Sequence, residues 1–199
     1  FYKSGILKSK ARYNNEHKSE YEISYSRNGE HDEEYELLKD KSIRNTTFHP
    51  NGKKKFSVIL VKDVYQDGNY EGYYEDGKVS RTLSIKDGKL DGVYTDFYED
   101  GKLNGEYAYS KGKLDGEYKS FYKNGKPFLV SHYKDGVLEG LFEKWNEDGQ
   151  YLNKQSYKNG KLEGKRLYFD EGKEYGYVTY KDGLPVDYEF KDLKGNPVA

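Results

Sequence analysis

Apolar and polar residues alternate along much of the chain, in short stretches that lie between glycine-containing turns. Residues 92–98 alternate in this way, and so do residues 79–85, where one predicted face holds Val79, Arg81, Leu83 and Ile85. A period of two residues that uses β-branched and aromatic side chains is typical of β-strands. The only candidate for a helix, Glu30–Lys41, is in register with its neighbours and is interpreted as a degenerate hairpin.

Glycine turns recur at a regular interval. Asn-Gly and Asp-Gly pairs are strong signals for tight hairpin turns, because glycine adopts the positive φ angle that such turns require. A first series of glycines steps through the chain at intervals of 23 to 25 residues: Gly5, Gly29, Gly52, Gly77, Gly101, Gly125, Gly149, Gly172 and Gly195. An aromatic residue lies four positions before each of the first eight: Phe1, Tyr25, Phe48, Tyr73, Phe97, Phe121, Trp145 and Tyr168. We therefore predict a tandem repeat of about 24 residues.

Two further series of glycines divide each later repeat. The second series follows the first by 11 residues and consists of Gly88, Gly112, Gly136, Gly160 and Gly183. The third follows four residues later and consists of Gly92, Gly116, Gly140 and Gly164. The N-terminal repeats lack the second-series glycine and have Glu16, Asp40 and Asp63 in its place. Each repeat is therefore predicted to contain two short strands separated by two turns.

These patterns predict an all-β fold, an elongated, twisted, single-layer antiparallel sheet of about eight tandem β-hairpin repeats. We divide the chain into degenerate N-terminal repeats over residues 1–64, well-formed repeats over 65–190, and a C-terminal cap or tail over 191–199. Charge, Gly and Pro break the pattern in the last of these segments, which suits protection of a sheet edge. Phe1 falls on a repeat boundary, so we expect the native chain to continue upstream or to have been trimmed there.

The aromatic content changes the picture that the charge content alone would give. Hydrophobic residues make up 34% and charged residues 35% of the chain, a balance that by itself favours disorder. The 23 Tyr, 9 Phe and 1 Trp favour order, because tyrosine can build a thin core that stays close to water. The 34 basic and 35 acidic residues are interleaved along the chain, so nucleic acid and anionic membranes are not favoured partners.

No set of residues points to catalysis. The 4 histidines lie in different repeats without the spacing of a metal site, and the cluster of His31 with Asp32, Glu33 and Glu34 is interpreted as a solvated strand or loop. The chain has no Cys, which removes disulfides, thiolate metal sites and cysteine nucleophiles. The turn aspartates lack the alternating oxygen ligands of a calcium loop and are interpreted as turn formers. We expect no enzyme activity, no metal and no cofactor.

A turn of Asp-Gly or Asn-Gly, then Lys-Leu-Asp-Gly or Lys-Leu-Glu-Gly, then an aromatic residue resembles the MORN repeat, and more closely its bacterial variant. The best stretches are Asp87–Tyr94, Gly112–Tyr118 and Asn159–Gly164. The resemblance covers residues 65–190 well, whereas residues 1–64 share only the period, the leading aromatic and the first-series glycine. It implies twisted sheets of successive hairpins with a groove, used in protein binding, membrane association or the scaffolding of attached enzyme domains.

Aromatic residues are the candidates for a binding surface. If the repeats stack in register, the leading aromatics form one row. We expect a surface that contains the leading aromatics Phe97, Phe121 and Trp145 and the adjacent Tyr98 and Tyr122. Trp145 stands where other repeats have Phe or Tyr, and tryptophan is enriched at interface hot spots. The alternative interpretation is that the row only packs the layer together.

A long repeated surface without a catalytic set favours a non-catalytic scaffold that binds a protein partner through an aromatic-lined groove. One alternative is a carbohydrate- or cell-wall-binding module, which the fixed aromatic spacing favours and the single Trp does not. Another is a lipid-binding or regulatory domain of a larger protein, which predicts basic grooves. We expect a secreted or cell-surface protein of a bacterium. The sequence leaves the partner and the oligomeric state open.

Overall fold

The computed structural model describes residues 8–13, 19–25, 31–38, 40–192 and 195–198. Within these ranges every helix or strand is a β-strand, and the described pairings between strands are antiparallel. The predicted all-β fold of tandem hairpins is confirmed. The expectations for Phe1, Gly5, Glu16 and Gly29 concern residues outside the described ranges.

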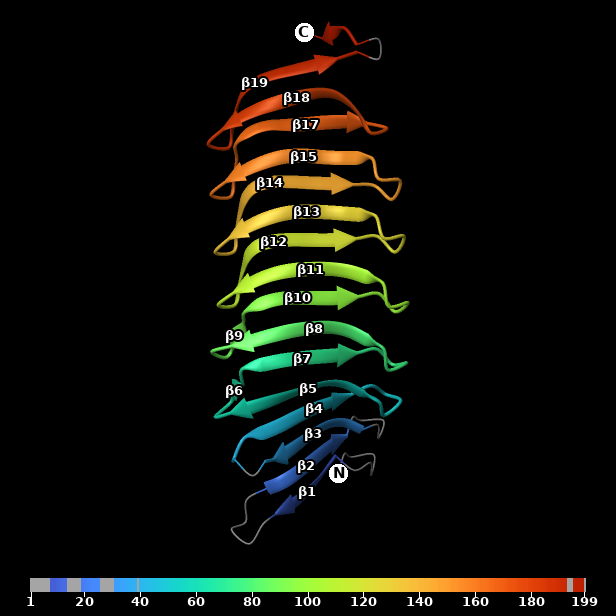
Figure 1. Ribbon diagram of the computed structural model, residues 1–199, viewed down its shortest axis with the longest axis vertical. Coiled ribbons are helices and arrows are strands. Elements are labelled where there is room, and N and C mark those ends of the chain that lie inside the picture. Colours follow the sequence, from blue (N-terminus) through green and yellow to red (C-terminus); the bar gives the residue numbers. More distant parts are fainter. Residues whose placement is uncertain (1–7, 14–18, 26–30, 39, 193–194, 199) are drawn as a thin grey trace. The chain divides into compact units, whose positions relative to one another are not determined.

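The chain divides into two compact units, each built from consecutive hairpins (Figure 1). Unit 1 comprises residues 1–92 and 99–101. Its strands are β1 (Ser9–Tyr13), β2 (Ser19–Tyr25), β3 (His31–Leu37), β4 (Ile43–Phe48), β5 (Lys54–Val61), β6 (Val64–Tyr65), β7 (Gly68–Tyr73), β8 (Val79–Lys86) and β9 (Lys89–Leu90). Strands β1 to β5 pair in chain order, β7 continues from β5 to β8, and the short β6 and β9 pair with β5 and β8. The stretch Glu30–Lys41 supplies β3, as the hairpin interpretation predicts.

Unit 2 comprises residues 93–98 and 102–199. Its strands are β10 (Gly92–Phe97), β11 (Leu103–Ser110), β12 (Lys113–Phe121), β13 (Pro127–Lys134), β14 (Val137–Trp145), β15 (Tyr151–Lys158), β16 (Lys161–Leu162), β17 (Gly164–Asp170), β18 (Lys173–Lys181), β19 (Leu184–Lys191) and β20 (Pro197–Val198). Strands β11 to β15 pair in chain order, β17 continues from β15 through β18 to β19, and β20 pairs with the end of β19.

The two glycine series form different turns. At the second-series turns both central residues have positive φ, as in Asp135 (50°) and Gly136 (86°), which is the type I′ geometry that matches the twist of a hairpin. First-series turns are longer: Tyr74 exchanges backbone hydrogen bonds with Gly77 and Lys78 around a glycine of φ 94°. The period of glycines therefore sets the alternation of short and longer turns.

A β-bulge accompanies the leading aromatic of most repeats. The pairing register shifts at Ser24/Tyr25, Thr47/Phe48, Gly72/Tyr73, Ser120/Phe121, Lys144/Trp145 and Tyr168/Phe169. A bulge inserts an extra residue into one strand and changes the direction of the side chains that follow. Side chains alternate between the two faces of the sheet along the middle of a strand. Because of the bulge, this alternation does not predict the face on which the leading aromatic lies.

The core is thin, as the tyrosine content predicts. Among the described residues, Val58 and Tyr70 are the hydrophobic side chains with an exposed fraction of 9% or less. Most aromatic rings are half-buried and pack in rows along a sheet face. In unit 2 the rings of Tyr107 and Tyr118 face each other across β11 and β12, with centroids 4.4 Å apart. Stability thus depends on such ring contacts between neighbouring strands.

Candidate binding surface

An aromatic groove lies on unit 2, near the turn that joins β12 to β13. Its volume is 360 Å³, and its lining residues are Tyr98, Asn104, Tyr118, Ser120, Phe121, Tyr122 and Phe128. We call it the Tyr118 groove. The rings of Tyr122 and Phe128 meet edge to face with centroids 5.2 Å apart. Three of the predicted site residues, Tyr98, Phe121 and Tyr122, therefore lie together in this groove.

Tyr118 is held in the groove by its position in the middle of β12. It lies opposite Tyr107 on β11 and opposite the fully buried Ser131 on β13. Its ring also packs near that of Tyr133, with centroids 6.0 Å apart. Burial, with a further contribution from the Asp96 carboxylate, raises the pKa of Tyr107 well above its ordinary value. Tyr107 is therefore neutral at physiological pH.

Two ammonium groups lie over rings of the Tyr118 groove. Lys144 Nζ is 4.9 Å from the ring centroid of Phe128, and Lys123 Nζ is 5.8 Å from that of Tyr98. Such contacts hold a cation above the face of an aromatic ring. Asn104 donates a hydrogen bond of 2.6 Å to Asp96 Oδ2, so its amide is already engaged. The groove thus combines apolar ring surface with positive charge at its margin.

The hydroxyl groups of the two adjacent tyrosines have a structural role. Tyr98 donates a hydrogen bond of 2.6 Å to the backbone oxygen of Phe121, and Tyr122 donates one of 2.8 Å to that of Trp145. Each bond connects one repeat to the next. Burial raises the pKa of Tyr122 above its ordinary value. The sequence prediction that these tyrosines belong to a binding surface therefore leaves out this structural role.

Loss of one such bridge has a measurable consequence. Tyr122→Phe removes the bond to Trp145 but keeps the ring, and we expect the free energy of unfolding to fall by about 1 kcal/mol. Urea denaturation followed by circular dichroism measures this change. Tyr133→Phe is the control, since within the described ranges its hydroxyl makes no hydrogen bond. Equal losses in the two variants would contradict a role for the bridge.

Polar side chains of the first-series turns make a second set of bridges. The side-chain nitrogens of Lys102, Lys126 and Gln150 donate to backbone oxygens of the next turn at 3.0, 2.8 and 2.9 Å. In unit 1, Lys53 and Lys78 make the same kind of bond. In these five turns the residue after the first-series glycine therefore connects its repeat to the next.

Trp145 and Phe97 lie outside the lining of the Tyr118 groove. The Trp145 ring packs on Tyr151, and Tyr151 stacks on Phe169, each pair with centroids 5.3 Å apart. Lys154 forms an ion pair of 2.9 Å with Glu143 beside this row, and the hydrogen bond to Glu143 raises the pKa of Lys154. Phe97 ends β10 and is half-buried.

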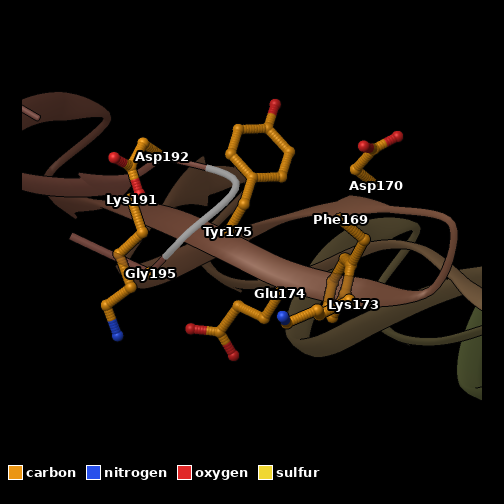
Figure 2. Close-up of a pocket in the computed structure, with 8 residues that line it drawn as sticks. All are labelled: Phe169, Asp170, Lys173, Glu174, Tyr175, Lys191, Asp192 and Gly195. Carbon is orange, nitrogen blue, oxygen red and sulfur yellow. The ribbon is translucent and has the colours of Figure 1, made fainter. Parts of the chain in front are cut away.

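The larger cleft of unit 2 lies where β17, β18 and the end of β19 approach one another. Its volume is 610 Å³, and its lining residues are Phe169, Asp170, Lys173, Glu174, Tyr175, Lys191, Asp192 and Gly195. Figure 2 shows Tyr175 and Asp170 pointing one way, and Glu174 and Lys191 pointing the other. Phe169 stands at the position of Tyr122 in its repeat and has no hydroxyl with which to bridge to the next turn. The mixed charges of the lining single out no class of ligand.

The candidate metal ligands do not cluster in the described part of the chain. Within it, no group of three or more His, Asp or Glu side chains is arranged to hold a metal ion. Glu33, from the acidic cluster of the sequence, accepts a hydrogen bond of 2.8 Å from Asn45 Nδ2. The side chain of His31 lies outside the described part of the structure. In the same described ranges, no helix is both long and apolar enough to cross a membrane.

Sequence reasoning missed four lining residues of the Tyr118 groove: Asn104, Tyr118, Ser120 and Phe128. Tyr118 follows the third-series glycine by two residues, at the position that Tyr94 and Phe142 occupy in neighbouring repeats. That spacing is a repeat signal as regular as the leading aromatic. Phe128 follows Pro127 and has no such counterpart, so only the folded hairpin brings it to the groove.

Comparison with known proteins supports the repeat assignment. The family model described as the MORN repeat variant matches residues 66–87, 90–111, 114–135 and 138–159 in tandem. No curated protein matches the chain. The matched segments contain Phe97, Phe121, Trp145 and the whole lining of the Tyr118 groove.

Proposed function

Because this chain carries four tandem MORN repeats of the variant type, we propose that it is a non-catalytic scaffold that binds a protein segment in the Tyr118 groove. The observation that carries the proposal is the convergence of Tyr98, Tyr118, Tyr122 and Phe128 from successive strands and turns. Aromatic side chains supply large contact area at low conformational cost and dominate many protein interfaces. The proposal includes a secreted or cell-surface location in a bacterium.

The shape and surroundings of the groove favour a peptide segment as its occupant. The tyrosine hydroxyls of Tyr98 and Tyr122 are engaged with backbone oxygens, which leaves ring faces and edges as the contact surface. An apolar side chain of a partner gains free energy from burial against such rings. Phe121 contributes to the same surface. Phe97 and Trp145 stay predictions as further contact residues in neighbouring repeats.

Peptide display tests the proposal directly. The purified chain would select binders from a random peptide library, and fluorescence anisotropy would measure the affinity of the selected peptides. We expect Phe128→Ala to weaken binding by about tenfold or more, the effect of removing an interface anchor. Tyr188→Ala is the control, because Tyr188 is exposed and does not line the groove.

The outcomes separate the competing functions. Selected peptides that bind the wild-type chain and the Tyr188→Ala variant tenfold more tightly than the Phe128→Ala variant would support the scaffold. Peptides that bind all three equally would place the site elsewhere. Retention of glycans on an array, lost in Phe128→Ala, would replace the proposal with a carbohydrate-binding function.

A further inference from the structure

Unit 1 carries a groove of its own, distinct from the Tyr118 groove. Its volume is 280 Å³, and its lining residues are Phe56, Val58, Tyr65, Arg81, Leu83, Ile85 and Leu90. Arg81 is the one charged residue in this lining, which is otherwise apolar and aromatic. We call it the Arg81 groove. Three of the lining residues, Arg81, Leu83 and Ile85, come from β8, and the sequence pattern predicts that they share one face of that strand.

Strand register explains how an arginine lies flat in an apolar groove. Phe56 on β5 pairs with Gly72 on β7, and Gly72 pairs in turn with Arg81 on β8. The Arg81 side chain crosses Gly72, and its Cζ lies 5.0 Å from the ring centroid of Phe56. A Cβ atom at position 72 would lie 2.7 Å from Arg81 Nε and 2.9 Å from its Cγ. Glycine at position 72 therefore provides the space in which Arg81 lies.

The guanidinium of Arg81 is held there without an anionic partner. Its Nε is buried, and among the described residues no atom accepts a hydrogen bond from it. No ion pair joins Arg81 to a carboxylate in the described ranges either. A buried donor on a charged group is costly unless an acceptor reaches it. Guanidinium groups pair best with carboxylates, through two parallel hydrogen bonds.

We propose that the Arg81 groove binds an extended peptide segment in which an acidic side chain lies between apolar ones. The carboxylate would pair with Arg81, and the apolar side chains would contact Phe56, Leu83 and neighbouring lining residues. Side chains on one face of an extended peptide recur every second residue, about 7 Å apart, which suits a shallow groove along a sheet. Sites for small molecules are usually enclosed and occupy about 300–1,000 Å³, so an open groove of 280 Å³ fits a peptide better than an isolated amphiphile.

A peptide array tests this inference. Each probe would be an N-acetylated, C-amidated pentapeptide with Ser at positions two and four and Leu, Phe, Gln, Glu or Lys at the other positions. We expect the tightest binders to carry one Glu among Leu or Phe. Exchange of that Glu for Gln should weaken binding about tenfold, as for loss of a hydrogen bond to a charged group. High salt should reduce the preference, because it screens the ion pair.

Variants assign the preference to Arg81. Arg81→Met should abolish the difference between Glu and Gln peptides. Gly72→Ala should also reduce it, because the new methyl group displaces the guanidinium while the charge remains. Arg166→Met is the matched control, since Arg166 lies over the Tyr168 ring at 5.2 Å in unit 2. It should keep the full preference for Glu.

Three results would overturn the inference. The first is equal binding of Glu and Gln peptides by the wild-type chain. The second is a preference for Glu that persists in a folded Arg81→Met variant. The third is Arg81-dependent binding of sodium decanoate when none of the peptides binds, which would assign the groove to an anionic amphiphile. If Arg81→Met does not fold, Arg81→Lys replaces it and should lose most of the preference, because a lysine lacks the guanidinium fork.

Discussion

Replacing Gly176 with alanine is expected to lower the free energy of unfolding by about 3 kcal/mol, the upper part of the range for overpacking a well-packed site. Gly176 is buried in β18, between Tyr168 on β17 and Phe190 on β19. The rings of Tyr168 and Phe190 meet across it, with centroids 5.5 Å apart. A Cβ atom would lie 2.5 Å from the backbone oxygen of Glu189 and would collide with the Phe190 ring. Urea denaturation followed by circular dichroism measures the loss.

Gly164→Ala separates packing from backbone conformation. Gly164 has a φ of 78°, and a Cβ atom there would meet nothing within 4 Å. Its substitution should therefore lower the free energy of unfolding only by the strain of an alanine in the left-handed conformation, about 1 kcal/mol. Gly176 has no positive φ, so its cost comes from contacts alone. If Gly176→Ala loses no more stability than Gly164→Ala, the Tyr168 and Phe190 rings do not close over β18 as described.

The hairpins could be predicted from the sequence because each depends on local residues. At the second-series turns, pairs such as Asp135-Gly136 adopt positive φ at both positions, so their spacing fixes these turns and the strands between them. The spacing of the glycines shows which residue follows each turn, but it does not show which atom of the next turn that residue bonds to. Lys126 follows its glycine as Lys102 does, but the backbone oxygen that it reaches belongs to a turn 22 residues later.

The binding surface could be predicted less well, because it depends on register between strands. The sequence places Phe121 and Trp145 in one row by their equal positions in the repeat. In the structure the Trp145 ring packs on Tyr151, and Phe121 joins Tyr118 and Phe128 in a groove. Bulges at both leading aromatics change the direction of the chain there, and the alternation of residues along a strand does not show a bulge.

Arg81 shows the same limit on the scale of one side chain. Alternation places it on an apolar face with Leu83, but it does not show which residues of the neighbouring strands lie beside it. The register between β5, β7 and β8 brings Gly72 beneath it and Phe56 beside it. The position of Arg81 over an aromatic ring can therefore be predicted only when the residues opposite it on the two neighbouring strands are known.

Stability is expected to fall steeply in alkali, beginning near pH 10. Folding raises the pKa of several tyrosines: burial is the main cause at Tyr35, Tyr70, Tyr107, Tyr109, Tyr122, Tyr157 and Tyr168, and a hydrogen bond to Glu71 is the main cause at Tyr73. A raised pKa means that the folded state holds its proton more tightly than the unfolded state. The stabilisation is therefore complete below the ordinary tyrosine pKa of about 10 and is lost as pH rises toward the folded value. Raised pKa values at Lys78 and Lys154, caused by hydrogen bonds to Asp76 and Glu143, act in the same direction.

Absorbance of tyrosinate and circular dichroism, recorded together against pH, measure this loss. We expect the buried tyrosines to ionise only as the strand signal disappears, in one cooperative step. Tyr107→Phe should make stability less dependent on pH above 10, because a phenylalanine has no proton to lose while Tyr107 is the most strongly shifted of the set. Tyr188→Phe, at an exposed position, is the control for the loss of a tyrosine hydroxyl. Complete ionisation near pH 10 with an intact strand signal would show that the tyrosine rows are open to water, and the thin core would then have to derive its stability from the backbone ladder alone.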